Sequence, residues 1–167
     1  GGIGFDTAEY LVHDKPETAQ TVDEFLHEWG VDITVSNAGG LTKPQPSPAK
    51  RQVTLLQRKT SKVGAGLGKT TGWIHRTALK HKGVNMVNGV TYEQVSDAGL
   101  HITVGGETQV LDVDNIVVCA GQEPQRELFD ALQAKGINVQ LIGGADVAAE
   151  LDAKRAIKQG TELALAF

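Results

Sequence analysis

The first four residues of the chain, Gly1-Gly2-Ile3-Gly4, have the types and spacing of a turn that binds phosphate groups. They match the end of a G-x-G-x-x-G fingerprint whose first glycine is missing. In the complete fingerprint a strand precedes the turn, and the helix that follows points its N-terminus at a pyrophosphate. We therefore expect the amides of Gly2 to Gly4 to bind a pyrophosphate, in a fragment that lacks its first strand. A tight strand–helix turn without a ligand is the alternative.

A second group of residues indicates which nucleotide the turn would accept. Residues 53–57 predict a strand, and Arg58 and Lys59 follow it, with Lys62 close by. In dinucleotide-binding folds an acidic side chain at this point accepts hydrogen bonds from the ribose 2′-hydroxyl, whereas cations favour a 2′-phosphate. The sequence therefore predicts NADPH over NADH. A solvated basic surface turn would have the same composition.

Residues 64–71 include Gly68, Lys69 and Thr70, which resemble part of a nucleoside-triphosphate-binding loop. The spacing excludes that loop, because the glycine required five residues before Gly68 is replaced by Val63. We expect instead a loop near the nicotinamide. Trp73 is expected to pack the following helix, and His75 either packs there or lines the site.

Composition excludes several functional classes. The 167 residues carry 16 basic and 20 acidic side chains, and this net charge of −4 argues against a general nucleic-acid surface. One cysteine, Cys119, cannot form an internal disulfide or a cysteine-rich cluster, and it fits a reducing cytoplasm; we expect it to be a buried core residue. The five histidines show no metal-binding spacing, and no apolar run approaches the roughly 20 residues of a membrane span.

The positions that should hold the chemistry lie on alternating helices and strands. Helices are predicted over residues 3–13, 17–29, 71–82, 126–135 and 147–165, with Pro16 ending the first. Strands are predicted over residues 53–57, 84–87, 90–95, 100–104, 109–113, 116–121 and 139–142. A loop rich in Gly, Pro and Ser is expected over residues 36–51.

Three expectations about packing follow from the same patterns. The stripe of Val22, Phe25, Leu26 and Trp29 is expected to belong to the core. Residues 90–113 alternate apolar and polar side chains, so they predict an antiparallel meander. Residues 116–121 are apolar on both faces, which is typical of a strand that is covered on both sides in a parallel sheet.

Segments 1–8, 56–59, 66–76, 118–124 and 141–153 resemble the C-terminal part of the bacterial NADPH-dependent 2,4-dienoyl-CoA reductases, which are disulfide-reductase-like flavoproteins. The resemblance implies an α/β fold: a Rossmann-like three-layer nucleotide-binding domain with an antiparallel β-meander, truncated at its first strand. Residues 1–124 would be the NADPH-binding domain, with residues 36–51 as a loop insertion. Residues 125–167 would be the closing segment of an FAD-binding domain.

The resemblance also implies cofactor contacts in the second half of the chain. Residues 143–146 are similar to a late flavin motif, in which Asp146 hydrogen-bonds FAD and the helix starting at Val147 points at the flavin. A simple N-cap role for Asp146 is the alternative. Gly121 and Gln122 would let a cofactor pass close to the backbone. The expected cofactor-binding residues are Gly1, Gly2, Ile3, Gly4, Arg58, Lys59, Gly121, Gln122, Gly143, Gly144, Asp146 and Val147.

The implied parent enzyme passes hydride from NADPH to FAD, and electrons then travel through a 4Fe–4S cluster to FMN, which reduces a dienoyl-CoA of unsaturated fatty-acid β-oxidation. The FMN barrel, the cluster cysteines and most of the FAD domain would lie outside this chain, as its missing partners. We expect the isolated chain to bind NADPH poorly or not at all and to reduce no dienoyl-CoA. A non-catalytic nucleotide-binding or structural remnant is the alternative.

The absent first strand should leave a gap at the centre of the sheet. Two segments are considered for filling it: residues 139–142 of the same chain, or a second copy of the chain in a homo-oligomer.

Overall fold

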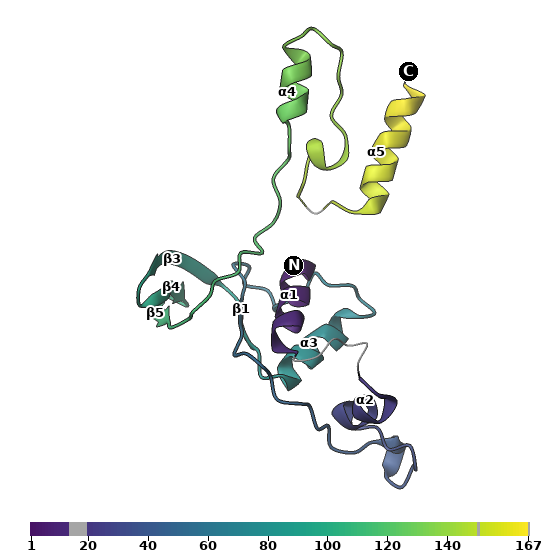
Figure 1. Ribbon diagram of the computed structural model, residues 1–167, viewed down its shortest axis with the longest axis vertical. Coiled ribbons are helices and arrows are strands. Elements are labelled where there is room, and N and C mark those ends of the chain that lie inside the picture. Colours follow the sequence, from purple (N-terminus) through teal and green to yellow (C-terminus); the bar gives the residue numbers. More distant parts are fainter. Residues whose placement is uncertain (14–19, 150, 167) are drawn as a thin grey trace. The chain divides into compact units, whose positions relative to one another are not determined.

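The computed structural model describes residues 1–13, 20–149 and 151–166. They form two compact units, Gly1–Cys119 and Ala120–Phe167, which are treated separately below. Figure 1 shows the helices and strands of each unit. Pro16 and Glu17, the expected end of the first helix and start of the second, lie outside the described residues.

Two helices pack against each other in the first unit. They are α1 (Gly2–Val12) and α3 (Gly72–His81), and they lie side by side in Figure 1. Their contact is apolar, because Phe5, Ala8 and Val12 of α1 form one buried cluster with Leu79 of α3. Of the positions expected from the sequence to face the sheet, Gly4, Ala8 and Val12 are buried, whereas Ile3 is 58% exposed.

A parallel pair of short strands lies beside these helices. β1 (Thr54–Leu56) pairs with β2 (Asn85–Val87), with Leu55 opposite Met86. Because successive side chains of a strand point to opposite faces, the two strands separate two cores. Leu55 and Met86 pack on the helical cluster, whereas Leu56 and Val87 pack on the opposite side.

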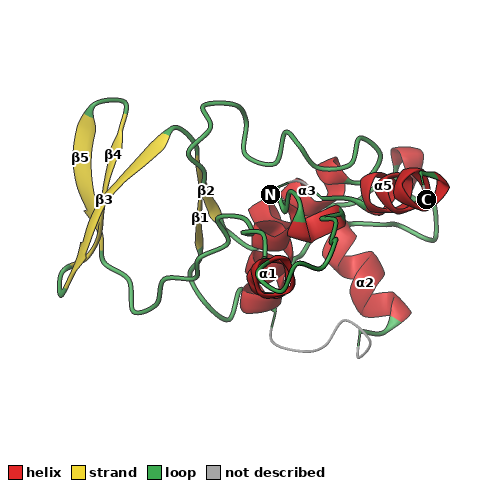
Figure 2. Ribbon diagram, turned by 90° about the horizontal axis from the view of Figure 1, so that it is seen from above, coloured by secondary structure: helices red, strands yellow, loops and turns green. Residues whose placement is uncertain are grey.

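The opposite side is covered by an antiparallel meander of β3 (Val90–Ser96), β4 (Gly99–Val104) and β5 (Glu107–Leu111). Val90, Leu100 and Ile102 form its buried cluster against Leu56 and Val87. In Figure 2 the parallel pair stands between α1 and α3 on one side and the meander on the other. The expected three-layer α/β arrangement with an antiparallel meander is therefore confirmed.

Helix α2 (Val22–Trp29) differs from the expectation for its apolar stripe. Its start is fixed by a capping box, in which Thr21 and Glu24 exchange side-chain and backbone hydrogen bonds. None of the described α2 residues is buried, and Val22 is 74% exposed. The stripe is therefore only partly buried, because α2 packs beside a loop and the end of α3, where the Trp29 ring lies 5.8 Å from that of His81.

That loop spans residues 31–53 and is irregular, as expected, apart from the 3₁₀ turn η2 (Ala38–Gly40). Asp32 organises its first half by accepting hydrogen bonds from the hydroxyl and amide of Thr34 and from both nitrogens of Asn37. These bonds, that from the Thr34 hydroxyl first, lower the pKa of Asp32 to about 2. The Asp32 carboxylate therefore stays ionised and keeps these hydrogen bonds at pH values well above 2.

Residues 116–121 do not form the doubly covered strand that the sequence predicts. They are in no strand, and Val117 and Val118 are 57% and 80% exposed. An extended segment becomes a strand only beside a partner that takes its backbone hydrogen bonds. None of the described residues pairs with this segment, so its apolar side chains stay in solvent.

The second unit contains α4 (Glu127–Gln133), the 3₁₀ turn η3 (Gly143–Ala145) and α5 (Ala153–Leu165). The strand predicted over residues 139–142 is absent from this described segment, so the idea that it fills the parallel sheet is wrong. The last helix begins at residue 153 rather than 147, because the Asp152 carboxylate accepts the Arg155 amide and acts as its N-cap.

Two glycines near Phe5 should respond oppositely to alanine. Gly4 has helical backbone angles, and an added Cβ would meet Leu55 Cδ1 at an ordinary 3.5 Å. Gly64 has φ +77°, and an added Cβ would lie 2.6 Å from Phe5 Cζ. We expect Gly4→Ala to keep or raise stability by up to about 1 kcal/mol and Gly64→Ala to lose roughly 2 kcal/mol, measured by urea unfolding. Equal losses in both variants would contradict this packing.

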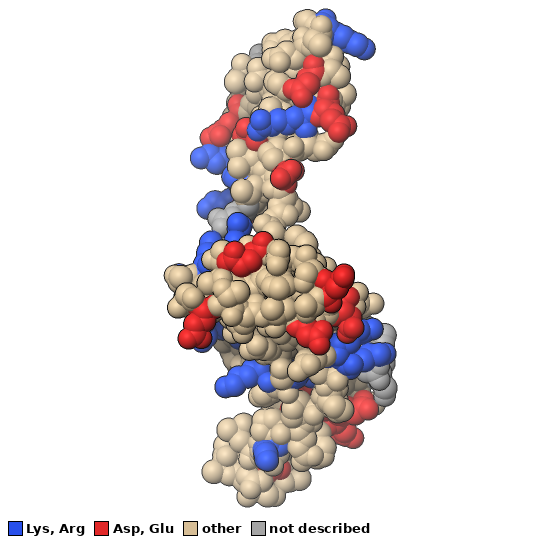
Figure 3. All heavy atoms as spheres, turned by 90° about the vertical axis from the view of Figure 1, so that its left-hand side faces the viewer, with Lys and Arg blue, Asp and Glu red and all other residues tan. Residues whose placement is uncertain are grey.

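The described residues contain no helix long and apolar enough to cross a membrane, and no cluster of His, Cys, Asp or Glu with metal-binding geometry. On the face drawn in Figure 3, basic and acidic side chains are interspersed.

Candidate functional site

The N-terminus of α1 and the basic residues after β1 belong to the same end of the first unit. Helix α1 runs antiparallel to β1: Val12, at its C-terminus, accepts the amide of Lys50 just before β1, at 3.0 Å. Gly4, near its N-terminus, lies against Leu55 within β1. The first turn of α1 is therefore directed toward the end of β1 that leads into Arg58 and Lys59. This end is where parallel sheets bind their ligands.

The backbone of the bend after β1 is held by internal hydrogen bonds. The side-chain amide of Gln57 donates to the carbonyls of Lys59 and Ser61, at 3.0 and 2.8 Å, and the amide of Gly89 donates to Lys59 as well, at 3.1 Å. The side chains of Arg58 and Lys59 are exposed. A fixed backbone with exposed cations can bind an anion without first ordering the loop.

The first turn of α1 has the features that an anion requires. Gly1 is the N-cap, it provides no side-chain cap, and the first turn carries no acidic residue. A Cβ added at Gly1 or at Gly2 would have no heavy atom within 4 Å, so a ligand can approach the backbone there closely. The free amides and the positive end of the helix dipole therefore fit a phosphate group.

Cys119 ends the first unit beside this helix. It is half-buried, rather than fully buried as expected, and its Sγ lies 3.7 Å from the hydroxyl of Thr7. Gly4 faces it too, since an added Cβ would come within 3.7 Å of Cys119 Cβ. The segment that leads into Gly121 and Gln122 thus starts next to α1, while these two residues belong to the second unit.

The expected flavin-binding residues lie in the second unit, and they are bonded to one another. Gln159 of α5 accepts the amide of Gly143 at 2.9 Å and donates to the carboxylate of Asp146 at 2.9 Å. Arg126 donates to the carbonyls of Ala145 and Asp146, at 3.0 and 2.5 Å. Gly144 and Val147 belong to the same short segment around η3.

This arrangement differs in one respect from the flavin motif that the sequence predicts. The helix expected to start at Val147 starts at Ala153, so Asp146 is not its N-cap. Gln159 bonds to the amide of Gly143 and to one carboxylate oxygen of Asp146. The FAD contacts expected of these residues stay a prediction.

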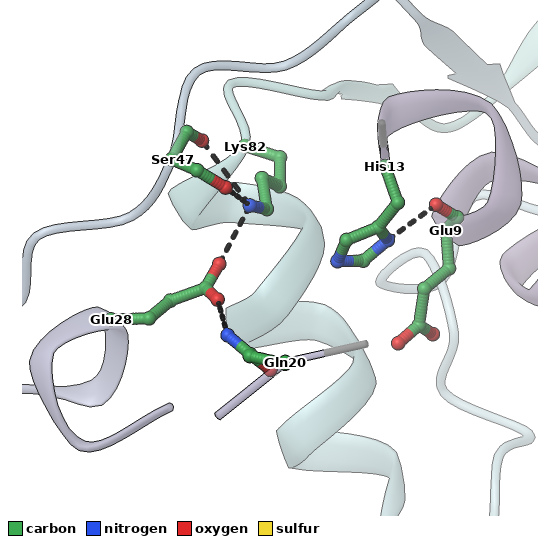
Figure 4. Close-up of polar contacts among 6 residues, drawn as sticks. All are labelled: Glu9, His13, Gln20, Glu28, Ser47 and Lys82. Carbon is green, nitrogen blue, oxygen red and sulfur yellow. Dashed lines mark hydrogen bonds and ion pairs between the residues drawn. The ribbon is translucent and has the colours of Figure 1, made fainter. Parts of the chain in front are cut away.

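An ion pair of a buried lysine, which the sequence did not reveal, holds α2 and the proline-rich loop onto α3. Lys82 follows α3, and its ammonium lies 2.6 Å from the Glu28 carboxylate and donates to the hydroxyl and carbonyl of Ser47, at 2.5 and 3.2 Å (Figure 4). The Lys82 side chain is only 3% exposed. Because the partners are far apart in sequence, no local pattern could have predicted the contact.

The other Glu28 oxygen accepts the side-chain amide of Gln20 at 2.6 Å, as Figure 4 also shows. Burial raises the pKa of Glu28, but the hydrogen bonds from Lys82 and Gln20 and the charge of Lys82 outweigh burial and leave the pKa below its ordinary value of 4.5. The stabilisation is therefore complete above pH 4.5 and is lost as the pH falls through the lowered pKa.

Because the pKa of Glu28 is lowered in the folded state, we expect stability to depend on pH. We expect the free energy of unfolding to fall more steeply in the wild type than in Glu28→Gln when urea unfolding is measured at successive pH values below 4.5, because only the wild type must protonate a paired carboxylate. Parallel pH profiles for the two proteins would show that Glu28 is not linked to folding in this way.

Comparison with known proteins places the chain in a family. Residues 8–155 match the pyridine nucleotide-disulphide oxidoreductases. The chain is 27% identical over 95 residues to the metal reductase of Desulforamulus reducens, covering 57% of this chain and 14% of the relative. It is 33% identical over 64 residues to the mercuric reductase of Staphylococcus aureus, covering 36% of this chain and 12% of the relative.

A solved structure of 2-naphthoyl-CoA reductase in complex with 2-naphthoyl-CoA superposes with a TM-score of 0.58 and 23% identity, over 70% of this chain and 18% of that one. The similarity shows a shared fold. The chain spans only about one seventh of the length of the curated relatives named here. Because the family match extends over most of the sequence, the chain belongs to the pyridine nucleotide-disulphide oxidoreductase family.

Proposed function

We propose that this chain is the NADPH-binding part of a flavoprotein reductase of the 2,4-dienoyl-CoA reductase type. The observation that carries the proposal is the direction of α1: its open glycine turn and the cations Arg58 and Lys59 belong to the same end of β1. Membership of a pyridine nucleotide family supports a dinucleotide ligand. The sequence motifs that resemble the 2,4-dienoyl-CoA reductases support this type of reductase.

Each part of the site has one role in this proposal. The amides of Gly2, Ile3 and Gly4 hold the pyrophosphate at the positive end of α1. Arg58 binds the 2′-phosphate through its guanidinium, and the ammonium of Lys59 adds attraction. When bound, NADPH supplies hydride to a flavin of the parent enzyme. The chain's own contribution is to bind and orient the nucleotide, and no catalytic residue is assigned.

The parent's activity belongs to parts that this chain does not contain. We propose that FMN, a 4Fe–4S cluster and most of the FAD site reside in partner regions of the parent, which reduces dienoyl-CoA in the cytoplasm. The single cysteine supports a reducing compartment and excludes a cluster bound by this chain alone. The isolated chain should therefore show no reduction of a dienoyl-CoA.

A fluorescence titration separates this proposal from the structural-remnant alternative. The purified chain is titrated with NADPH, and a parallel sample is supplied with NADPH and a dienoyl-CoA. Weak but saturable NADPH binding without turnover is the expected result. An absence of binding at millimolar NADPH would favour the remnant, and turnover by the chain alone would contradict the division of labour between this chain and its partners.

A further inference from the structure

A groove on the side of α3 that faces away from α1 has no role in the proposed NADPH site. It is a hollow of about 530 Å³ within the first unit, bordered by α3, by β2 and by the loop after β1. Its lining comprises Lys62, Val63, Trp73, Arg76, Thr77, Lys80, Val84, Met86 and Asn88.

The helical spacing of the lining shows that the groove and the α1 contact use different faces of α3. Trp73, Arg76, Thr77 and Lys80 recur at i, i+3, i+4 and i+7, so they form one stripe. The contact with α1 is made by other positions: Leu79 is buried in the shared core, and His75 lies 3.3 Å from Glu9. The groove is therefore separate from the glycine turn of α1.

The charge of the groove is uncompensated. Lys62, Arg76 and Lys80 contribute three cations, and no acidic residue lines the hollow. Among the residues that the structure describes, none of these three cations forms an ion pair with a carboxylate. Arg76 uses one nitrogen to donate to the carbonyl of Gly64 at 2.9 Å, which fixes its guanidinium at the groove. Clustered cations repel one another, so an anion bound here would relieve that repulsion.

Besides Thr77 and Asn88, the rest of the lining is apolar. Trp73 is 57% exposed, contrary to the expectation that it packs the helix, and its indole is free to stack on a planar ring. Val63, Val84 and Met86 are the aliphatic part of the lining. The volume falls within the range of small-molecule sites, and it is far too small for a nucleic-acid duplex.

We propose that this groove binds a phosphorylated aromatic small molecule of the nucleotide class, separately from the NADPH site. Lys62, Arg76 and Lys80 hold the phosphate groups, and Trp73 stacks on the base. Such a ligand satisfies all three cations and covers the exposed indole, which neither inorganic phosphate nor an uncharged aromatic compound would do.

Isothermal titration calorimetry of the full chain with ADP and with inorganic pyrophosphate tests the proposal. We expect saturable binding of both probes, with Lys80→Gln weakening both about tenfold or more through loss of a charge-assisted contact. Trp73→Leu should weaken ADP binding and leave pyrophosphate binding unchanged. The matched control Lys43→Gln removes an exposed charge outside the groove and should change neither.

The outcomes distinguish the groove from the NADPH site. In amide chemical-shift mapping, ADP should shift the amides of Trp73, Arg76 and Lys80. No binding at millimolar ADP, equal weakening by Lys43→Gln and Lys80→Gln, or ADP-induced shifts of Gly2 to Gly4 without shifts of these three amides would overturn the proposal. ADP binding that Trp73→Leu does not affect would overturn the nucleotide assignment.

Discussion

Lys82→Met is expected to lower the free energy of unfolding by roughly 2 kcal/mol, because it leaves the half-buried Glu28 carboxylate without its cation and removes the hydrogen bonds to Ser47. Among the described residues, Lys82 is the only one that forms an ion pair with Glu28. Urea unfolding followed by circular dichroism measures the loss.

Two variants make this result specific. Lys158→Met removes an exposed i,i+4 pair with Glu162 on α5, and it should cost less than about 0.5 kcal/mol. The double variant Glu28→Gln/Lys82→Met should be more stable than Lys82→Met alone, because it carries no unpaired, partly desolvated carboxylate. A loss below about 0.5 kcal/mol in Lys82→Met would mean that the pair does not hold α2 and the proline-rich loop onto α3.

Arg58→Ala is expected to weaken NADPH binding about tenfold or more and to leave NADH binding unchanged. The reason is that the two dinucleotides differ only in the 2′-phosphate, for which Arg58 provides a bidentate cationic partner. Titrations of both nucleotides into the wild type and the variant measure the ratio of dissociation constants.

The control for this experiment is Lys43→Ala, which removes an exposed cation from the loop after α2. It should not change the preference for NADPH. If Arg58→Ala weakened NADPH and NADH equally, the guanidinium would be acting on a group that both nucleotides share, and the assignment of the 2′-phosphate to Arg58 would be wrong.

Local patterns in the sequence were sufficient for most of the first unit. The small and apolar residues at Gly4, Ala8 and Val12 placed α1, and Gly83 marked the end of α3 correctly. Alternating residues predicted the meander, because one face of it packs on β1 and β2 while the other meets solvent. Each of these elements carries its own periodic pattern, so it could be predicted although partners such as α1 and α3 lie far apart in the sequence.

The failures have a common physical cause. Residues 116–121 and 139–142 have the composition of buried strands, but a strand also needs a neighbour, and neither segment has one among the described residues. The sequence of α2 alone does not distinguish a core helix from a helix whose apolar stripe is largely exposed. Local composition cannot supply such long-range information, and the pair of Lys82 with Glu28 depends on it entirely.

The candidate site was likewise predicted only in part. The sequence singled out the glycine turn and the basic residues after β1, and the structure directs both toward one end of the unit. The groove went unrecognised, although Trp73, Arg76 and Lys80 form a regular helical stripe. A solvent-facing stripe of that kind is common in ordinary helices, so its spacing alone carried no functional signal.

The central claim is that the first turn of α1 and the bend after β1 bind one NADPH molecule together. Amide chemical-shift mapping of the isotope-labelled chain during an NADPH titration tests it most directly. The account predicts that the amides of Gly2, Ile3, Gly4, Arg58 and Lys59 shift together and with one dissociation constant. Shifts confined to the groove residues of α3, or shifts of the bend without the glycine turn, would contradict it.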